Sequence, residues 1–373
     1  MKFTIDKHNW KLVKLGEVVT KKEENDRDNA QTRFDRFLKV EHMDSGSLHI
    51  KRWASQKSGD EINPTFYKIF RKGQILFPTR NPHLKRTALA SFDGICGEKT
   101  LTLEANEDLI LQEFLPFIFH SESFYAHTTS SIVGSTNPHC RWRDVAEFEF
   151  LLPPKEQQSK LAGLLWSLDD LIEMDKGLLQ KCRLAKSVDF ENFVTEADGE
   201  SMPLSKILRL KKSKSPVPHQ RKKYIGLEHI TSGAYTCNTF GDSSEVKAQC
   251  NLVDIGDLCY SKLRPYLDKA FISDFEAVST TELLVYETEF ASKEYVLHHF
   301  HSKAFVDYVT GKGFGTKMPR VNQKIIGEYV VKVLADERPL INRMSKYAEV
   351  ELLCNDRINA NINLNKSITN KVF

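Results

Sequence analysis

Basic and hydrogen-bonding side chains gather in two short segments that occupy matching places in the two halves of the chain. The first reads TRNPHLKR (79–86) and the second reads SKLRPYLDK (261–269). Lysine and arginine bind phosphate oxygens, and Arg, Asn, Gln or Lys can also read base edges in the major groove of DNA. We therefore treat these segments as candidate nucleic-acid contacts. The candidate residues are Arg80, Asn81, His83, Lys85, Arg86, Lys262, Arg264, Tyr266 and Lys269.

A second pair of segments has the same character. TNPHCRWR (136–143) and GFGTKMPRVNQ (313–323) also lie at matching places, and RLKKSKSPVPHQRKK (209–223) is basic without a single acidic residue. A solvated basic turn would have the same composition, so the sequence leaves DNA contact and plain solvation open for every one of these segments. The further candidates are His139, Arg141, Arg143, Lys317, Arg320 and Gln323.

Motifs of catalysis or cofactor binding are missing from the sequence. It contains no GxxxxGK[ST] phosphate loop and no GxSxG elbow, and the glycine-rich GKGFG (311–315) follows a presumed helix rather than a strand. NPTF (63–66) resembles the base-holding loop of amino-methyltransferases but lacks its second proline, which favours a simple turn before a strand. His298, His299 and His301 have no acidic partner in register, so we expect ordinary helix histidines. The sequence predicts no catalytic residue and no metal site.

Composition places the chain among ordinary globular proteins. Its 373 residues suffice for two or three domains, and a net charge of +3 permits nucleic-acid binding only through local patches. The seven cysteines form no CxxC pair, as expected for reduced thiols in the cytoplasm. The stretch LILQEFLPFIF (109–119) is too short for a membrane span and the N-terminus lacks a signal-peptide core. We therefore expect a soluble, cytoplasmic protein that has no membrane partner.

The second half of the chain repeats the plan of the first. FLKVEHMDSG (37–46) returns about 185 residues later as YIGLEHITSG (224–233), and further matches follow in the same order. This period is too long for a solenoid and indicates a duplicated unit. The matched positions are Glu41–His42 with Glu228–His229, Gly73 with Gly256, Pro82 with Pro265, Phe92 with Phe275, His120–Ser121 with His301–Ser302, Phe124 with Phe305, Gly134 with Gly315, and Pro138 with Pro319.

Each copy begins with strand-like runs and continues into a helix. The runs at 73–80, 86–92 and 99–105 are rich in β-branched and aromatic residues, and their counterparts in the second copy have the same character. Helices are expected around 109–127 and 291–310, although Pro116 interrupts the first pattern. The predicted counterpart strands are 257–263, 269–275 and 282–288.

A long amphipathic helix closes each copy. Apolar residues recur every three or four positions after Pro153–Pro154, and again after residue 335, so each helix carries one apolar stripe. Helices of this length cannot bury their stripes alone, which favours an antiparallel coiled coil between them. The alternative is that each helix folds back on its own domain. The stripe residues are Leu161, Leu165, Leu168, Ile172, Leu179, Ile341, Met344, Leu352 and Ile358.

The predicted fold is therefore α+β, with two similar domains joined by two long antiparallel helices in a pseudo-twofold repeat. The first domain is assigned to residues 1–152 and the second to residues 200–335. The central helix is assigned to residues 153–199 and the distal helix to residues 336–373.

The segment LLPPKEQQSKLAGLLWSLDDLIE (151–173) resembles the start of the central spacer helix in DNA-specificity subunits of type I restriction–modification systems. In that family an apolar strand, prolines and Glu-Gln precede Ile/Leu-rich heptads. The duplicated order of domain and helix is also similar, so the resemblance covers essentially the whole chain. The matching residues are Pro153, Pro154, Glu156, Gln157, Leu161, Leu165, Leu168, Asp169 and Ile172.

The resemblance implies a subunit that is not itself an enzyme. Each domain would be a target-recognition domain that reads one half of a split, asymmetric site on double-stranded DNA. The helices would set the gap and dock two methyltransferase subunits, which carry S-adenosylmethionine, and restriction subunits would join that core. ATP and magnesium would likewise belong to partner subunits.

Two other functions stay open at this stage. One is a DNA methyltransferase with fused recognition domains, against which the missing cofactor and catalytic motifs speak. The other is a protein scaffold whose coiled coil is the function. Binding to duplex DNA that weakens as salt rises would separate recognition from scaffolding, because phosphate contacts release counterions.

Overall fold

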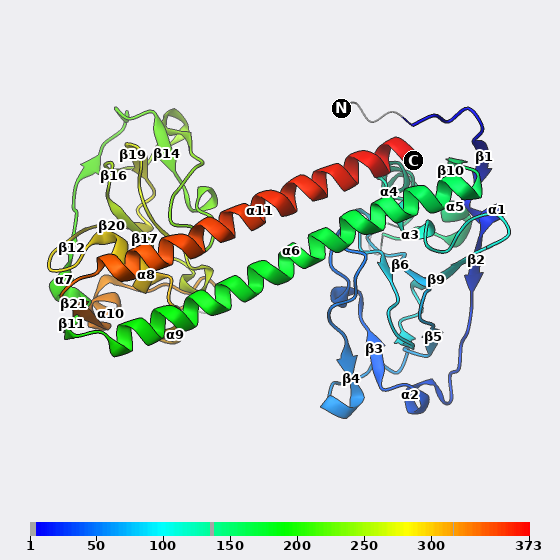
Figure 1. The fold of residues 1–373 in the computed structure, drawn as a ribbon, viewed down its shortest axis with the longest axis horizontal. Coiled ribbons are helices and arrows are strands. Elements are labelled where there is room, and N and C mark those ends of the chain that lie inside the picture. The colour runs from blue at the N-terminus through cyan, green and yellow to red at the C-terminus, as the bar shows by residue number, and fades with distance from the viewer. Residues whose placement is uncertain (1–4, 135–137, 316) are drawn as a thin grey trace. The chain divides into compact units, whose positions relative to one another are not determined.

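The computed structural model describes residues 5–134, 138–315 and 317–373, and the chain divides into two compact units. Unit 1 comprises Met1–Lys176 and Asp356–Phe373, and unit 2 comprises Gly177–Asn355. Each unit contains a mixed α/β domain together with a stretch of two long helices, α6 (Lys155–Glu196) and α11 (Arg338–Val372) (Figure 1). The α+β class predicted from the sequence is confirmed.

Unit 1 is built on three sheets of short strands. Two of them are four-stranded, with the orders β2-β9-β6-β7 and β4-β3-β8-β5, and the third pairs β1 with β10. The strands predicted from β-branched runs are present as β6, β7 and β9. The bounds are β1 Lys11–Lys14, β2 Val19–Lys22, β3 Arg36–Leu38, β4 Ala54–Ser55, β5 Lys68–Phe70, β6 Ile75–Pro78, β7 Ala88–Leu89, β8 Gly94–Cys96, β9 Thr100–Ala105 and β10 Glu149–Leu152.

The helix predicted at 109–127 is broken in two, which corrects that prediction. The first piece ends at Ile118, and Ser121 caps the second, because its Oγ accepts a hydrogen bond from the Phe124 amide at 3.2 Å. Unit 2 repeats the break, where Ser302 Oγ accepts from the Phe305 amide at the same distance. The helices of unit 1 are α1 Leu15–Val18, α2 Ala30–Arg33, α3 Leu115–Ile118, α4 Glu122–Ser130 and α5 Trp142–Ala146, with 3-10 turns η1 Val40–His42, η2 Gln56–Ser58 and η3 Pro82–Leu84.

Unit 2 repeats the sheet plan of unit 1. Its sheets have the orders β12-β20-β17-β18, β13-β16-β19-β14-β15 and β11-β21. In both units one parallel pair, β3 with β8 or β14 with β19, lies inside an otherwise antiparallel sheet. The bounds are β11 Gly199–Pro203, β12 Leu208–Leu210, β13 Lys214–Ser215, β14 Lys223–Ile225, β15 Gly241–Asp242, β16 Cys250–Val253, β17 Leu258–Ser261, β18 Ala270–Ile272, β19 Ala277–Ser279, β20 Leu283–Thr288 and β21 Val330–Leu334.

The helices of unit 2 follow the same order as those of unit 1. The helix predicted at 291–310 is present as two helices, α8 and α9, because Ser302 begins a new one. The bounds are α7 Leu204–Ile207, α8 Lys293–Phe300, α9 Lys303–Gly311 and α10 Gln323–Glu328, with η4 Leu227–His229, η5 Ser243–Glu245 and η6 Pro265–Leu267.

The glutamines after Pro153–Pro154 anchor the start of α6 to unit 1. Gln158 is buried, accepts from the Leu111 amide at 2.8 Å and donates to the Leu109 and Pro153 carbonyls. Gln157 accepts from the Trp10 indole at 2.7 Å. Buried amides need such partners, so the PPKEQQ motif fixes the direction in which the helix leaves the domain.

Helices α6 and α11 pack antiparallel in each unit. In unit 1, Asn365 donates to the Leu165 carbonyl at 3.3 Å, and Arg357 pairs with buried Asp175 at 3.1 Å. In unit 2, Arg343 of α11 pairs with Asp189 of α6 at 2.9 Å, in the same antiparallel register. The predicted pairing of the two long helices is confirmed.

Most of the predicted stripe lies inside these contacts. Leu352 is the exception and corrects the prediction, because its side chain is 63% exposed while Cys354 is buried. The stripe of α11 therefore follows a different phase over this stretch. Buried stripe residues are Leu165, Leu168, Ile172, Leu179, Met344 and Ile358, and half-buried ones are Leu161 and Ile341.

Candidate nucleic-acid interface

The candidate segment of unit 1 forms a tight turn at the end of β6. Its centre is the 3-10 turn η3, which is flanked by Asn81 at φ 52° and Lys85 at φ 50°. Non-glycine residues rarely adopt this left-handed conformation, and where they do the surrounding structure must hold them. The Asn81 amide donates to the Pro138 carbonyl at 3.1 Å, and the Lys85 carbonyl accepts from the Gly46 amide at 2.8 Å.

The candidate segment of unit 2 has the same backbone. Its 3-10 turn η6 is flanked by Arg264 at φ 51° and Asp268 at φ 47°. The Arg264 amide donates to the Pro319 carbonyl at 2.7 Å, and the Asp268 carbonyl accepts from the Gly233 amide at 2.8 Å. We call the two segments, 79–86 and 261–269, the recognition turns.

Glycine is required where each recognition turn meets the preceding loop. Gly46 and Gly233 both have φ of 70°, and both donate their amides to the turn. A side chain at either position would be forced into the left-handed region that glycine occupies without steric cost. The glycine shared by the two copies is thus explained by the turn that it supports.

The second pair of basic loops lies against the recognition turns. In unit 1 an antiparallel bridge joins Arg80 to His139, and the Cys140 amide donates to the Thr79 carbonyl at 3.0 Å. In unit 2 the bridge joins Leu263 to Arg320. The structure therefore brings the two predicted loops of each copy together into one surface. Residues 135–137 and 316 of these loops lie outside the described residues.

Several candidate side chains are engaged within their own unit. Lys85 pairs with Glu122 at 2.5 Å, Arg86 donates to the Val40 carbonyl at 3.2 Å, and Lys269 donates to the Leu227 carbonyl at 2.6 Å. Arg143 and Arg320 pair with Asp144 and Glu282. These groups hold the surface in shape.

The other candidates differ in how far they are exposed to solvent. The exposed ones are Arg80, His83, Arg141, Tyr266, Lys317 and Gln323, and the half-buried ones are Asn81, His139, Lys262 and Arg264.

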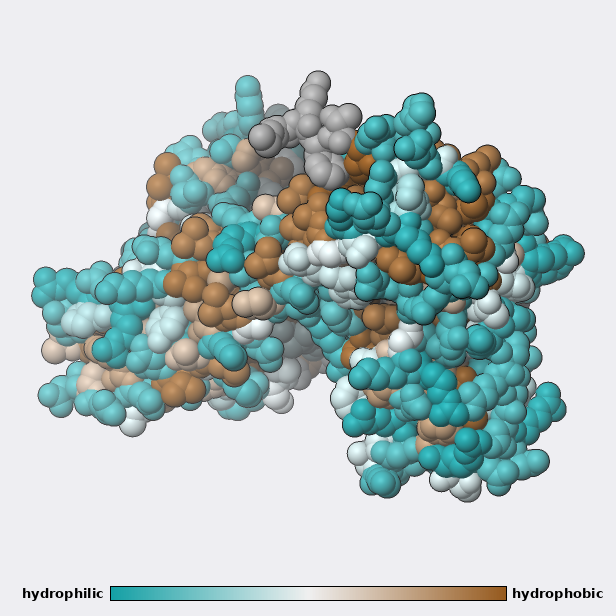
Figure 2. Space-filling model, turned by 45° about the vertical axis from the view of Figure 1, so that its right-hand side comes forward, coloured by the Kyte–Doolittle hydropathy of each residue, from teal (hydrophilic) through white to brown (hydrophobic). Residues whose placement is uncertain are grey.

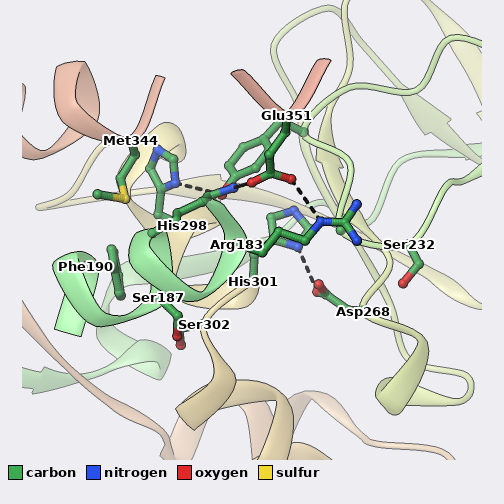
Figure 3. A pocket seen from close by; sticks show the side chains of 13 residues that line it. Arg183, Ser187, Phe190, Ser232, Asp268, His298, His301, Ser302, Met344 and Glu351 are labelled. Atoms are coloured by element: carbon green, nitrogen blue, oxygen red, sulfur yellow. Dashed lines mark hydrogen bonds and ion pairs between the residues drawn. The ribbon is translucent and has the colours of Figure 1, made fainter. Parts of the chain in front are cut away.

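Behind the recognition turn of unit 2 lies a cavity of about 270 Å³, lined by residues of the turn, α6, α8 and α11 (Figure 3). Glu351 of α11 pairs with Lys186 at 2.9 Å and with Arg183 at 3.3 Å, both on α6. Asp268 of the turn accepts from His301 at 2.7 Å. Each carboxylate in the cavity thus has its own partner, and the contacts tie the turn to the helices.

Unit 1 has a corresponding cavity of about 420 Å³. There His49 pairs with Asp169 and Lys51 pairs with Glu173, both at 2.5 Å, so a loop of the domain is tied to α6. The hydrogen bond with Asp169 raises the pKa of His49 above its ordinary value. We call these two contact regions the joints.

Three histidines near the joints stay neutral, of which His298 and His299 are buried and His120 is half-buried. Burial lowers the pKa of His298 and of His299 to about 3 and that of His120 to about 4. The expectation that the histidines of 298–301 lack an acidic partner is wrong for His301, which bonds to Asp268. Within the described part of the chain, no group of three or more His, Cys, Asp or Glu is placed to hold a metal ion.

Two of the cations in the basic segment 209–223 serve the fold of unit 2. Lys211 pairs with Asp254 and, at 2.7 Å, with Asp257, while Arg221 pairs with Asp254 and donates to the Val253 carbonyl at 2.6 Å. These two side chains therefore neither bind DNA phosphate nor lie free in solvent, which were the two alternatives for this segment. Spacing alone missed these pairs because their partners lie more than 30 residues away along the chain.

The predicted turn at NPTF (63–66) is confirmed, since Asn63 Oδ1 accepts from the Thr65 amide at 2.9 Å just before β5. Across the ranges that the structure describes, no helix is long and apolar enough to cross a membrane.

Comparison with known proteins points to one family. Residues 7–183 match the type I restriction modification DNA specificity domain. The chain is 22% identical over 313 residues to the type I restriction enzyme EcoDI specificity subunit of Escherichia coli, covering 71% of this chain and 70% of that subunit. It is 27% identical over 156 residues to the MjaIX specificity subunit of Methanocaldococcus jannaschii, covering 40% of this chain and 36% of that subunit. The match to this second relative thus spans about a third of the relative's length.

Solved structures support the same fold over the whole chain. One neighbour comes from a structural study of complex assembly and conformational transition of the type I R-M system, with a TM-score of 0.57 and 16% identity. That match covers 97% of both chains. Another is the type I restriction-modification S subunit from M. genitalium, with a TM-score of 0.54 and 14% identity, covering 100% of this chain and 98% of that one.

The duplicated sheets, the paired long helices and the PPKEQQ anchor are thus accompanied by a direct family match. Residues 7–183 match the type I restriction modification DNA specificity domain, and the family predicted from the sequence is confirmed.

Proposed function

We propose that this chain selects the DNA sequence for a type I restriction–modification system and carries out no catalysis itself. One observation carries the proposal. Both units hold a recognition turn with the same backbone, but the side chains on that backbone differ. A protein that reads two different half-sites needs a common scaffold with different contact residues.

Each recognition turn, with the loop beside it, is the proposed reader of one half of a split, asymmetric site on double-stranded DNA. In unit 1 the exposed Arg80 and Arg141 are suited to guanine edges or phosphates. In unit 2 we assign contacts with base edges or phosphates to Lys262, Tyr266 and Lys317. Candidates engaged inside their unit, such as Lys85 and Lys269, keep the turn in place.

The long helices are the proposed spacer and docking surface. Hydrophobic patches interrupt the otherwise hydrophilic face seen in Figure 2. On α6 the partly exposed Leu164, Leu171 and Leu178 recur every seven residues, and apolar side chains in such a row commonly mark a protein interface. We assign this face to two methyltransferase subunits, which supply S-adenosylmethionine. Restriction subunits, with ATP and magnesium, join that complex.

Under this proposal the recognition domains are 1–152 and 200–335, and the spacer helices lie within 153–199 and 336–373. Helix α6 has 42 residues, or about 63 Å at 1.5 Å per residue. We propose that a helix of this length sets the gap between the two half-sites.

The test is to co-express the chain with its methyltransferase subunit and map modified bases by single-molecule methylation sequencing. We expect a motif of two specified halves around an unspecified gap. Methylation without any split motif would contradict the proposal. Arg80→Ala should relax the motif in one half only, and Lys262→Ala in the other.

The spacer is tested by inserting four residues after Leu179. The insertion adds about 6 Å to the helix and turns its two ends relative to one another. We expect a gap longer by one or two base pairs (about 3.4 Å each), or loss of methylation. An unchanged gap would rule out the helix as the spacer.

A further inference from the structure

Unit 1 carries a cation between two aromatic rings on its second sheet. Arg36 begins β3, Trp53 immediately precedes β4, and Phe92 lies in the turn before β8. The Arg36 guanidinium carbon lies 4.6 Å from the Trp53 ring centroid and 5.0 Å from that of Phe92. The two rings meet edge to face, with centroids 5.4 Å apart.

Unit 2 carries the same arrangement with different residues. Lys223 begins β14, Phe240 immediately precedes β15, and Phe275 lies in the turn before β19. The Lys223 ammonium lies 4.4 Å from the Phe240 centroid and 4.3 Å from the Phe275 centroid, and the rings are 5.3 Å apart. We call the two sets the cation–aromatic clusters. Arg and Trp in unit 1 correspond to Lys and Phe in unit 2, but both clusters place a cation against two aromatic rings.

Packing alone does not account for the clusters. Trp53 is 42% exposed and Phe240 is 47% exposed, and both lie at the edge of the sheet rather than in the core. A ring that served packing alone would be stabilised more by full burial, because the hydrophobic effect grows with the apolar area removed from water. A neighbouring cation does not add to that stabilisation. A ring face attracts a cation without neutralising its charge, so the positive group is held in place and still available.

The nearby acidic groups are occupied elsewhere. Asp35 accepts from the Ser55 hydroxyl and, at 2.8 Å, from the Lys57 amide. Asp93 accepts from the Lys72 amide at 2.8 Å and pairs with Arg71 at 2.9 Å. In the described parts of the chain Arg36 forms no ion pair.

The same holds in unit 2. Asp242 accepts from the Ser244 amide at 2.8 Å, and the exposed Glu276 lies 3.9 Å from Arg221. Lys223 has no ion pair with any described residue. Each unit therefore displays next to an exposed ring one oriented cation that has no ion-pair partner among the described residues.

Each cluster connects directly to the recognition turn of its own unit. Strand β3 leads from Arg36 into η1, whose Val40 carbonyl accepts from Arg86 of the turn at 3.2 Å. In unit 2, β14 leads from Lys223 into η4, whose Leu227 carbonyl accepts from Lys269 at 2.6 Å. A contact made by the cluster would thus fix the position of the turn.

We propose that the two cation–aromatic clusters grip the phosphate backbone of duplex DNA, one per unit, and position each recognition turn over its half-site. This inference rests on the proposed function and adds positioning residues to it. Phosphate contacts set register and orientation but do not read sequence, so the clusters should affect affinity and leave the motif unchanged.

The experiment uses the complex of the full chain with its methyltransferase subunit and measures duplex affinity over a range of salt concentrations. Arg36→Gln and Lys223→Gln should each weaken binding several-fold and reduce the slope of log affinity against log salt by about 1, because one phosphate contact is lost. The methylated motif should stay the same. Arg33→Gln is the matched control, since Arg33 also lies over a ring, Phe34, but is already paired with Asp26 at 2.7 Å.

A second pair of variants separates a DNA contact from a structural role. Arg36→Lys with Trp53→Phe gives unit 1 the residue types of unit 2, and it should retain the wild-type salt slope. Trp53→Ala and Phe240→Ala should weaken binding, whereas Phe290→Ala, which removes a 71% exposed ring from unit 2, should not. Thermal unfolding of every variant is recorded alongside.

Three results would overturn the inference: a wild-type salt slope in both Gln variants, an altered motif, or affinity losses that merely follow a lower melting temperature. Failure of the proposed function looks different, because the wild-type complex itself would then show no split motif. The salt slopes could still be compared on any duplex.

Discussion

The recognition turns of units 1 and 2 share a backbone and differ in what they display. Both have two left-handed residues around a 3-10 turn, a proline carbonyl that accepts from the first and a glycine amide that donates to the second. Asn81 and Lys85 occupy the left-handed positions in unit 1, whereas Arg264 and Asp268 occupy them in unit 2. Because backbone bonds fix the turn, its side chains can change without loss of shape. This is what a pair of readers with different targets requires.

The joints differ in the same way. Unit 1 ties its domain to α6 with a histidine–aspartate pair, His49–Asp169, while unit 2 ties α6 to α11 with Lys186 and Arg183 on Glu351. Only the first of these sets contains a group that titrates near neutral pH. The comparison of the two units can therefore be tested by paired substitutions.

The largest effect is expected from the paired phenylalanines. Phe124 and Phe305 are fully buried at matching positions, so replacing either with Ala should cost about 3–5 kcal/mol of unfolding free energy. Denaturant unfolding measures the loss, and hydrogen exchange should locate it in the unit that carries the change. Phe290→Ala, at an exposed site, serves as the control. If one of the buried pair tolerated Ala, the two cores would not be equivalent.

The helix caps should give smaller and equal effects. Ser121→Ala and Ser302→Ala each remove the acceptor for the first turn of a helix, at a cost of about 1 kcal/mol. Ser167→Ala is a suitable control, because its hydroxyl bonds only to the Gly163 carbonyl within α6. Unequal costs in melting experiments would show that the break in the helix is needed in only one copy.

Exchanging the first left-handed residue should sharpen the comparison of the turns. Arg264→Asn places the residue of unit 1 in unit 2, and Asn tolerates this conformation better, so stability should rise by about 0.5–1 kcal/mol. Methylation sequencing of the same variant should show a relaxed half-site if Arg264 contacts DNA. The reverse change, Asn81→Arg, should destabilise unit 1. A loss of stability in Arg264→Asn would contradict the strain argument.

The smallest effect should come from the pH dependence of the joint in unit 1. Because Asp169 raises the pKa of His49, the bond stabilises the fold below the ordinary imidazole pKa of about 6.5. That contribution is lost as pH rises through the higher folded value. His120, His298 and His299 have lowered pKa values, so their effect on stability has the opposite sense.

The measurement is therefore the difference in melting temperature between wild type and His49→Gln. It should shrink as pH rises from below to above neutrality. A difference that stays constant with pH would mean that His49 is not charged in the folded protein.

The sequence predicted six of the strands, β6, β7, β9, β17, β18 and β20, and the pairing of the long helices, because both depend on local periodicity. It also identified the matched residues that the structure explains. Ser121 and Ser302 are caps, Pro138 and Pro319 supply carbonyls to the turns, and His42 accepts from the Lys39 amide as His229 does from Gly226.

Other predictions failed for identifiable reasons. Leu352 was placed on the buried stripe because spacing alone could not reveal the change of phase in α11. The sequence predicts one helix at 109–127 and one at 291–310, whereas the structure has two helices in each stretch, because a serine within an apolar run can begin a second helix. The partner of His301 was missed because Asp268 lies 33 residues away.

The duplicated frame and the amphipathic repeats determined the plan of this protein from sequence alone, because each is a local pattern with a fixed physical meaning, whereas the family followed from the resemblance of the residues around PPKEQQ to known specificity subunits. Tertiary structure decided which basic side chains form ion pairs or hydrogen bonds within their own unit and which face outward. It also placed Arg36 between Trp53 and Phe92, and Lys223 between Phe240 and Phe275. Such contacts join strands far apart in the chain, and no local pattern encodes them.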